Sequence, residues 1–553
     1  MRPRGRGYVF SSLIFLFLVL FLSFIFYQDS LNFQYVNLDD ALLIKYRFSY
    51  IFNPANIINS FKTNVMYLSD STAFYYRPIL TISFILDALF FKDNFRGYHL
   101  TNIVLHLVSI ILVYKLMLRL EVQIYVALFV TLIFALHPVL MQTIAWVPGR
   151  NDSLLLVFSI SNFFYFLNYL KSGGLKDFLF FLFFAFLSVF VKETAIFFLV
   201  ILLAYLFLIL DWKKHIKRSL LVFSAFMVIF VLWYFMALNF SDKQGSYLGY
   251  LVHTNWLSYF PRVVIPGYLT YFGKIVWPFN LSVFPILDLT NSNIKFGILF
   301  LIFLFLSFFL FVSKKRRKIF VFGLIWFLVL LFPTFVNLMP GEPNIIYEHR
   351  LYLPLVGLLL SFSQINFVRL GLSYRKVFLL LSLLVVIFFW KGNRNHIFAF
   401  KDSRSFWEDA YLNSSQHFVT EVGLSGVYLS EGEIDKAEEV FRKLAEIKPD
   451  TEISHLGFAS LYYNKKEYEK SLQELEKVLK INPKSVRAMQ YMGSIKEKQE
   501  DYEEAEKYYL EALKIDNQNI DLLMGLVAFY VRRGRIEDAK KIYSQVQSMG
   551  ISF

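Results

Sequence analysis

The sequence predicts an all-α polytopic membrane protein of about eleven transmembrane helices, followed by an α-solenoid of helical repeats. Of its 553 residues, 57% are hydrophobic and only 18% are charged, whereas soluble domains are roughly 45–50% apolar with about 25% charge. The apolar runs stop abruptly near Trp390, and a segment rich in Glu, Lys and Tyr follows. These observations exclude a single soluble fold and a disordered chain.

Apolar runs separated by short polar gaps predict a membrane domain over residues 1–392. The first run follows Arg2, Arg4 and Arg6 and lacks a small-residue cleavage site, as expected of an uncleaved signal anchor. The predicted spans are 8–27, 98–118, 122–137, 153–170, 177–191, 195–210, 219–238, 295–312, 319–335, 352–368 and 376–391.

Charge predicts the orientation of these spans. With the N-terminus in the cytoplasm, residues 28–97 form a first external loop, and every predicted inner gap is basic, which agrees with the positive-inside rule. Part of the net charge of +14 is therefore topological, and we expect no nucleic-acid partner. We expect a multi-pass protein of the inner (plasma) membrane, with its C-terminal repeats in the periplasm or outside the cell.

A 34-residue period predicts four tetratricopeptide repeats at 418–451, 452–485, 486–519 and 520–553, after a connector and lead-in helix at 393–417. One register holds small residues, namely Ala437, Ser471, Ala505 and Ala539, and another holds Phe441, Leu475, Tyr509 and Tyr543. Such solenoids present a concave face that binds peptide or protein. A rigid spacer and a platform for self-association are the alternatives.

The first external loop contains a pair of carboxylates, Asp39 and Asp40, about twelve residues after the first span. An Asp before an apolar run is typical of a helix N-cap, and spacing alone favours that interpretation. The alternative is a general base at the membrane surface, where partial desolvation makes a carboxylate a better proton acceptor.

Cations recur at the predicted outer ends of the spans, against the positive-inside trend. Guanidinium groups match the oxygens of a phosphate, so a bound phosphate is one explanation, and pairing with nearby Asp152, Glu193 or Glu348 is the other. Paired Asp with a His can also bind a divalent metal, although no ligand spacing requires one. The cations are Arg77, His137, Arg150, Lys192, His349 and Arg350.

The ordered motifs of the predicted outer face, followed by the repeats, resemble the transmembrane and tetratricopeptide repeat-containing O-mannosyltransferases and their bacterial relatives, which belong to the GT-C glycosyltransferase superfamily. The resemblance covers nearly the whole chain, and it lies in the order of the motifs. These are LDD (38–40), YRPI (76–79), GYHLTN (97–102), HPVLMQTIAWVPGRND (137–152), KET (192–194) and EHRLYLP (348–354). The chain departs from the family pattern at His349, which separates Glu348 from Arg350.

The resemblance implies a membrane glycosyltransferase that moves a sugar, mannose or another hexose, from a polyprenyl phosphate to an external hydroxyl with inversion. It implies Asp39 as the base, with Asp40 as the alternative base, substrate orienter or metal ligand. It implies Arg350 and His349, with Arg77, at the donor phosphate. His137, Arg150, Asp152, Lys192, Glu193 and Glu348 are further candidates for substrate contacts, and His137 alternatively caps a span.

The expected partners are the polyprenyl-linked sugar, membrane lipid and an acceptor protein bound by the repeats and modified on Ser or Thr. No cofactor is required, and a divalent metal stays open. The rival interpretations are glycosylation of a glycan or lipid by the same chemistry, and a non-catalytic membrane-anchored repeat scaffold for envelope assembly.

Overall fold

The computed structural model describes residues 6–36, 38–45, 47–65, 75–240, 256–335, 345–366, 374–414, 418–517 and 519–548. Throughout these ranges the ordered elements are helices, and the only β-contact among them is an isolated bridge between Ile286 and Ile345. The all-α prediction is therefore confirmed for this part of the chain. Arg2 and Arg4 of the predicted N-terminal basic segment, and residues 549–553 of the fourth repeat, lie outside the described residues.

The described residues divide into two compact units. The first contains residues 6–36, 54–65 and 75–401, and the second contains residues 38–53 and 402–548. The segment with Asp39 and Asp40 therefore groups with the repeats.

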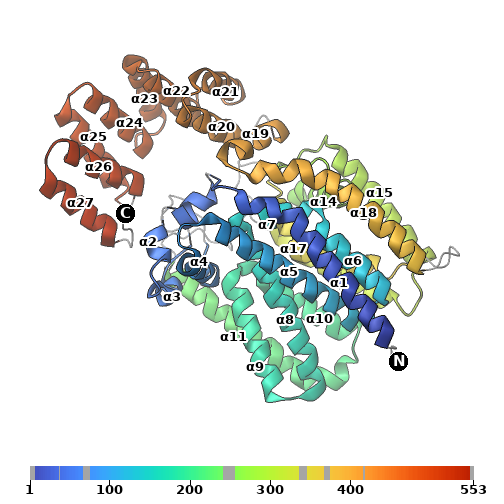
Figure 1. Ribbon diagram of the computed structural model, residues 1–553. Helices are drawn as coiled ribbons and strands as arrows, with labels where there is room; N and C mark the ends of the chain where they lie inside the picture. Colours follow the sequence, from blue (N-terminus) through green and yellow to red (C-terminus); the bar gives the residue numbers. More distant parts are fainter. Residues whose placement is uncertain are drawn as a thin grey trace. The chain divides into compact units, whose positions relative to one another are not determined.

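The first unit is a bundle of apolar helices (Figure 1). Its α-helices are α1 (Arg6–Tyr27), α3 (Asn56–Asn59), α4 (Pro78–Phe91), α5 (Phe95–Arg119), α6 (Ile124–Leu136), α7 (Met141–Ala145), α8 (Arg150–Ser172), α9 (Leu175–Val191), α10 (Phe198–Leu208), α11 (Trp212–Phe240), α13 (Trp256–Tyr259), α14 (Ile265–Val276), α15 (Ser292–Leu310), α16 (Arg317–Leu331), α17 (Tyr352–Phe362) and α18 (Tyr374–His396). Short 3₁₀ segments join them, including η4 (Pro138–Leu140), η6 (Glu193–Phe197) and η9 (Glu348–Leu351).

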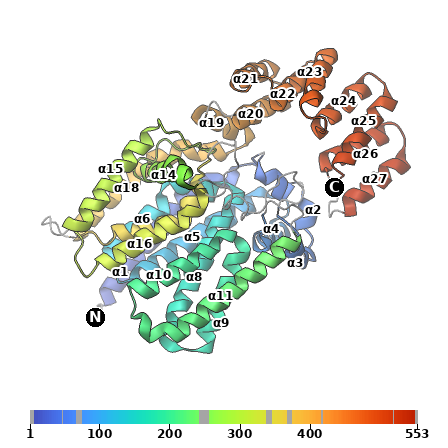
Figure 2. The ribbon, with the colours of Figure 1, turned by 180° about the vertical axis from the view of Figure 1, so that it is seen from behind.

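Within this bundle, α6 packs against α1, α5 and α18, while α8 packs against α5, α9 and α11. Figure 2 shows α8, α9 and α11 side by side. The helices α16 and α17 approach so closely that a Cβ on Gly357 would lie 2.6 Å from the carbonyl oxygen of Gly323. The segment η9 packs against α7, α17 and η4.

Each of the eleven predicted spans overlaps a helix, but the count of eleven is not confirmed. Six helical segments of the described chain are long and apolar enough to cross a membrane, or seven if α6 and α7, bent by 52°, form one span. The helices α9, α10 and α17 have 17, 11 and 11 residues, and a crossing helix needs about 20. The multi-pass membrane architecture stands with fewer full-length spans.

The second unit contains the repeats, preceded by α19 (Ser403–Asn413), which Asp402 caps by accepting from the Ser405 backbone N–H at 2.8 Å. The second helices of the four pairs begin at 34-residue intervals, which confirms the predicted period. The unit also holds a π-turn at Ala41–Lys45 and α2 (Phe48–Ile51). The repeat helices are α20 (Phe418–Ser430), α21 (Ile434–Ile447), α22 (Glu452–Asn464), α23 (Tyr468–Ile481), α24 (Val486–Lys498), α25 (Tyr502–Ile515), α26 (Ile520–Arg532) and α27 (Ile536–Ser548).

The predicted small-residue register is the packing register of these repeats. Ala437, Ser471 and Ala505 are fully buried, and Ala539 is 4% exposed. The turn inside each repeat needs a left-handed residue, and Gly432, Lys466, Glu500 and Gly534 supply it with φ between 62° and 79°. Gly occupies this position only in the first and fourth repeats. The left-handed backbone therefore recurs every 34 residues even where the residue is not Gly.

Candidate functional site

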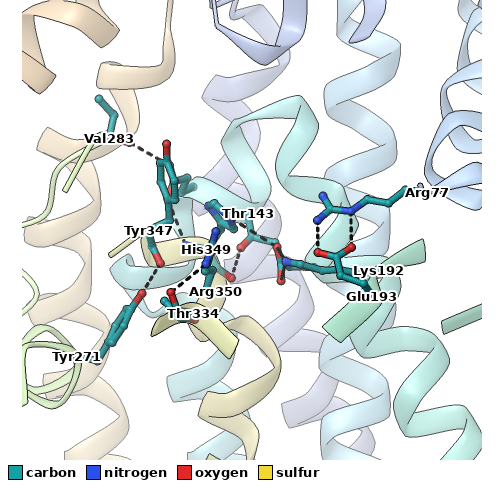
Figure 3. A network of polar contacts seen from close by, with 12 residues as sticks. Arg77, Thr143, Lys192, Glu193, Tyr271, Val283, Thr334, Tyr347, His349 and Arg350 are labelled. Carbon is teal, nitrogen blue, oxygen red and sulfur yellow. Dashed lines mark hydrogen bonds and ion pairs between the residues drawn. The ribbon is translucent and has the colours of Figure 1, made fainter. Parts of the chain in front are cut away.

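A cluster of charged side chains lies where several helices of the first unit end (Figure 3). We call it the cationic cluster, and it consists of Arg77, Asp152, Lys192, Glu193, His349 and Arg350. Arg77 precedes α4, Asp152 lies in the first turn of α8, and His349 and Arg350 lie in η9. Six of the residues singled out from the sequence therefore meet in one region of the fold.

Lys192 and Glu193 diverge because the helix breaks between them. Lys192 ends α9 with an extended backbone (φ −156°, ψ 129°), and Glu193 begins η6. The two neighbouring side chains consequently have different partners, as expected for adjacent opposite charges.

Arg77 forms a two-point ion pair with Glu193. Its Nε donates to Oε2 at 2.9 Å and its Nη2 donates to Oε1 at 2.6 Å. The guanidinium also lies 4.4 Å from the centre of the Tyr75 ring. These contacts fix the Arg77 side chain and neutralise its charge. Pairing with a neighbouring carboxylate, the alternative to phosphate binding, therefore describes Arg77.

Lys192 pairs with Asp152 in the same way. Its Nζ donates to both carboxylate oxygens, at 2.7 and 2.9 Å, and both side chains are more than nine-tenths buried. The second oxygen of Asp152 lies 4.0 Å from His349 Nε2. Asp152 therefore connects the lysine to the histidine of η9.

Arg350 differs from the other two cations of the cluster. Its Nη1 donates to the Thr334 carbonyl at 3.4 Å, and its guanidinium lies 5.7 Å from the Tyr347 ring centre. Within the described ranges no carboxylate forms an ion pair with it. Arg350 is therefore the cation of the cluster whose charge the neighbouring described side chains leave uncompensated.

His349, which precedes Arg350, and the neighbouring Trp146 each have a buried nitrogen atom that lacks a partner. His349 Nδ1 and Trp146 Nε1 make no hydrogen bond to any described residue, and the two rings lie 5.9 Å apart. Unsatisfied buried polar atoms are rare and call for an explanation. Both nitrogens can hydrogen-bond to a ligand, and the Arg350 guanidinium can donate to ligand oxygens. Trp146 belongs to the motif at residues 137–152. It was not predicted as a site residue, because Trp is usually a core residue.

The charge of the cluster acts on His349. Burial, followed by the nearby cations Lys192, Arg350 and Arg77, holds the pKa of His349 well below its usual range. The imidazole is therefore neutral at physiological pH, and it can donate one hydrogen bond without adding charge. Burial lowers the pKa of Lys192, Arg77 and Arg350 lower it further, and Asp152 partly offsets these effects.

Arg150 forms a separate, fully buried network. Its Nη1 lies 2.5 Å from Asp87 Oδ2, its Nε donates to Asn102 Oδ1 at 2.9 Å, and its Nη2 donates to the Tyr98 carbonyl at 2.9 Å. These contacts tie α4, α5 and α8 together, so Arg150 is committed to internal partners. Asp87 was missed in the sequence because it lies alone in an apolar run.

His137 directly follows α6, and its side chain caps the next segment, η4, instead of the predicted span itself. Its Nδ1 accepts from the Val139 backbone N–H at 3.2 Å at the start of η4, and its Nε2 lies 2.9 Å from the Ile275 carbonyl. It belongs to the bend between α6 and α7 and not to the cationic cluster.

Glu348 pairs with residues that the sequence did not single out. Lys274 Nζ donates to its Oε1 at 2.7 Å, the Ser282 backbone N–H donates at 3.1 Å, and His396 Nε2 lies 3.5 Å from Oε2. The carboxylate is fully buried. Glu348 therefore anchors η9 to α14 and α18, next to His349 and Arg350.

Asp39 and Asp40 lie in the second unit and begin a helical turn there. Asp39 is partly exposed, whereas Asp40 is 1% exposed. Among the described residues no three His, Asp or Glu side chains gather as a metal site would require.

Comparison with known proteins identifies related segments in both halves of the chain. Residues 79–236 match the family model described as dolichyl-phosphate-mannose-protein mannosyltransferase, and residues 409–546 match the C-terminal ARM domain of tetratricopeptide repeat protein 21. Protein O-mannosyl-transferase F38B6.6 of Caenorhabditis elegans is 34% identical over 90 residues, and protein O-mannosyl-transferase TMTC3 of Mus musculus is 33% identical over 99 residues.

These two stretches cover 16% and 18% of this chain, and 13% and 10% of the respective relatives. Together with the fold, the matches confirm the resemblance stated from the motifs: a mannosyltransferase-type membrane region followed by a helical repeat domain.

Proposed function

We propose that this chain is a membrane glycosyltransferase that transfers mannose, or another hexose, from a polyprenyl-phosphate carrier to Ser or Thr hydroxyls of proteins. The observation that carries the proposal is the grouping of Arg350 with the unpartnered nitrogens of His349 and Trp146. A leaving phosphate needs positive and hydrogen-bonding groups around it. The mannosyltransferase family match over residues 79–236 supports the same reaction class.

In the proposed reaction the acceptor hydroxyl gives its proton to a carboxylate and its oxygen attacks the anomeric carbon of the sugar. The bond from that carbon to the phosphate oxygen breaks, configuration inverts, and polyprenyl phosphate leaves. We assign Asp39 as the base and Asp40 as its alternative. Partial exposure allows Asp39 to meet an acceptor, whereas Asp40 is buried.

We assign Arg350 and His349 to the leaving phosphate, with Trp146 as an additional donor. Arg77 and Lys192 keep their carboxylate partners and hold the surrounding helix ends in place, while Arg350 supplies the uncompensated positive charge. The proposed reaction needs only acid–base groups and cations, and the alternative role of Asp40 is that of ligand to a divalent metal.

The repeats recruit the acceptor protein in this proposal. Their concave face is the surface that such solenoids use for peptides. We place the chain in the plasma membrane with its N-terminus in the cytoplasm and its repeats outside, because the predicted inner gaps are basic.

Mass spectrometry of envelope proteins, lipids and glycans tests this function in cells that make Asp39→Asn, Asp40→Asn, the double variant or Arg350→Ala. Asp93→Asn, an exposed carboxylate of the same chain, is the matched control. We expect a hexose-sized mass to disappear from specific proteins in the double and Arg350 variants and to persist in the control. Arg350→Ala should slow transfer about 10²–10³-fold, as for other groups that stabilise developing charge.

Loss of the sugar from lipid or polysaccharide alone would change the acceptor class. If no mass changes, while deletion of residues 403–553 still disturbs the envelope, the repeat scaffold is the correct interpretation.

A further inference from the structure

A basic cavity lies in the first unit between the C-terminal end of α8 and the first turns of α11. Its volume is about 720 Å³. The cations that line it are Lys171, Lys213, Lys214, Lys217 and Arg218. Within the described part of the chain no Asp or Glu lines it, so the cavity carries a concentrated positive charge that the proposed reaction does not use.

Neighbouring groups neutralise little of this charge. Lys214 lies 3.4 Å from Asp211, and both side chains are largely exposed, so that pair is weak. Arg218 donates from Nη1 to the Leu170 carbonyl at 2.6 Å, which links α11 to the end of α8 but leaves its charge unpaired. Lys171, Lys213 and Lys217 form no ion pair with any described residue.

Apolar side chains also line the cavity. Leu167 and Leu170 of α8 are buried there, and Leu210 and Ile216 complete the lining. Beside it, Leu220 and Leu221 of α11 are 59% and 49% exposed. Cations and apolar side chains in one lining suit a ligand with an anionic head and a hydrocarbon tail.

The cavity also lies where a membrane boundary is expected. Both α8 and α11 are long and apolar enough to cross a membrane, and residues at the end of one and the beginning of the other line the cavity. Trp212, 39% exposed, stands at the same level, as Trp does at membrane–water interfaces.

We propose that this cavity binds the phosphate headgroup of an anionic phospholipid, whose acyl chains lie along the exposed leucines of α11. Basic pockets between membrane helices recognise such headgroups. A free phosphate would use the cations alone, whereas a phospholipid uses the cations, the leucine lining and the neighbouring apolar surface. The lipid would join α8 to α11 on the predicted cytoplasmic side of the membrane, where the inner gaps are basic.

Native mass spectrometry of the full-length chain in detergent tests the proposal by titration with phosphatidylglycerol and with phosphatidylcholine. We expect tighter binding of phosphatidylglycerol. The variant Lys213→Ser/Lys217→Ser should lose roughly tenfold in affinity for it, since each basic residue near an anionic lipid contributes several-fold.

Lys314→Ser/Lys315→Ser is the matched control, because it removes two exposed lysines of another predicted inner gap that do not line the cavity. Equal losses in the two double variants would overturn the proposal in favour of unspecific surface attraction. Equal binding of the two lipids would also overturn it. Displacement of the lipid by an equimolar amount of inorganic phosphate would show a free-anion site instead.

Discussion

Lys192 and Asp152 illustrate how single residues of the cationic cluster depend on one another. Both side chains are buried, and the lysine donates to both oxygens of the carboxylate. Burying a charge is costly, and the attraction of its partner offsets that cost only while both members are present. The pair is therefore best tested by removing one charge and then both.

Lys192→Met should destabilise the protein by about 3–5 kcal/mol, because it leaves the Asp152 carboxylate buried without its cation. The double variant Lys192→Met/Asp152→Asn should recover most of that loss. Thermal unfolding of the purified chain in detergent measures both. A double variant as unstable as the single one would show that the pair acts through packing and not through charge.

His349 gives a prediction for pH. Burial and nearby cations lower its pKa in the folded chain, while an unfolded His titrates near about pH 6.5. Below that pH the unfolded state binds a proton at His349 and the folded state does not. The free energy of unfolding is therefore highest above about pH 6.5 and falls as the pH decreases below that value. His349→Gln lacks this proton, and its unfolding temperature should decrease less than that of the wild type between pH 7 and pH 5. Parallel decreases would contradict the lowered pKa.

At the scale of elements, the first helices of two repeats show that glycine is required on the packed face and optional on the exposed face. A Cβ on Gly493 of α24 would lie 2.8 Å from the Tyr509 ring of α25. A Cβ on Gly426 of α20 would meet no atom within 4 Å. Both glycines lie inside helices, so they form a matched pair.

Gly493→Ala should destabilise its repeat by about 1–3 kcal/mol through overpacking. Gly426→Ala should stabilise α20 by about 0.5–1 kcal/mol, because alanine loses less backbone entropy in a helix. Hydrogen exchange of the full-length chain measures the local change at α24–α25 and at α20–α21. Faster exchange in both variants would show that the two helix faces are packed alike.

In the first unit, the short segment η9 positions the residues proposed to bind phosphate. Glu348 binds Lys274 of α14 and lies next to His396 of α18, while the following two residues enter the cationic cluster. The same short element therefore carries an anchor and two proposed phosphate ligands. Its position depends on helices that lie far away along the sequence.

At the scale of the whole molecule, the chain has no Cys, so introduced cysteines report topology without background. We expect Ser430→Cys, exposed in the repeats, to react with a membrane-impermeant maleimide on intact cells. Lys214→Cys, in a predicted inner gap, should react only after the membrane is permeabilised. The wild type, which has no thiol, is the control, and the reverse pattern would invert the proposed orientation.

The sequence by itself determined the helical class, the division into a membrane region and repeats, and the 34-residue register. Apolar content and periodicity are local properties, and each residue contributes to them whatever lies across the fold. The motifs also predicted the residues of the cationic cluster. Arg77, Lys192 and Arg350 lie next to helix ends, and the pattern of apolar runs indicates those ends.

Only the tertiary structure decided which of these charges is paired. The pairs Arg77–Glu193, Lys192–Asp152 and Lys274–Glu348 join residues 116, 40 and 74 positions apart, and spacing along the chain does not encode such partners. The same holds for the unpartnered nitrogens of Trp146 and His349. Helix lengths also came from the fold, since an apolar run does not show where its helix ends: α10 has 11 residues, fewer than the roughly 20 that a membrane-crossing helix needs.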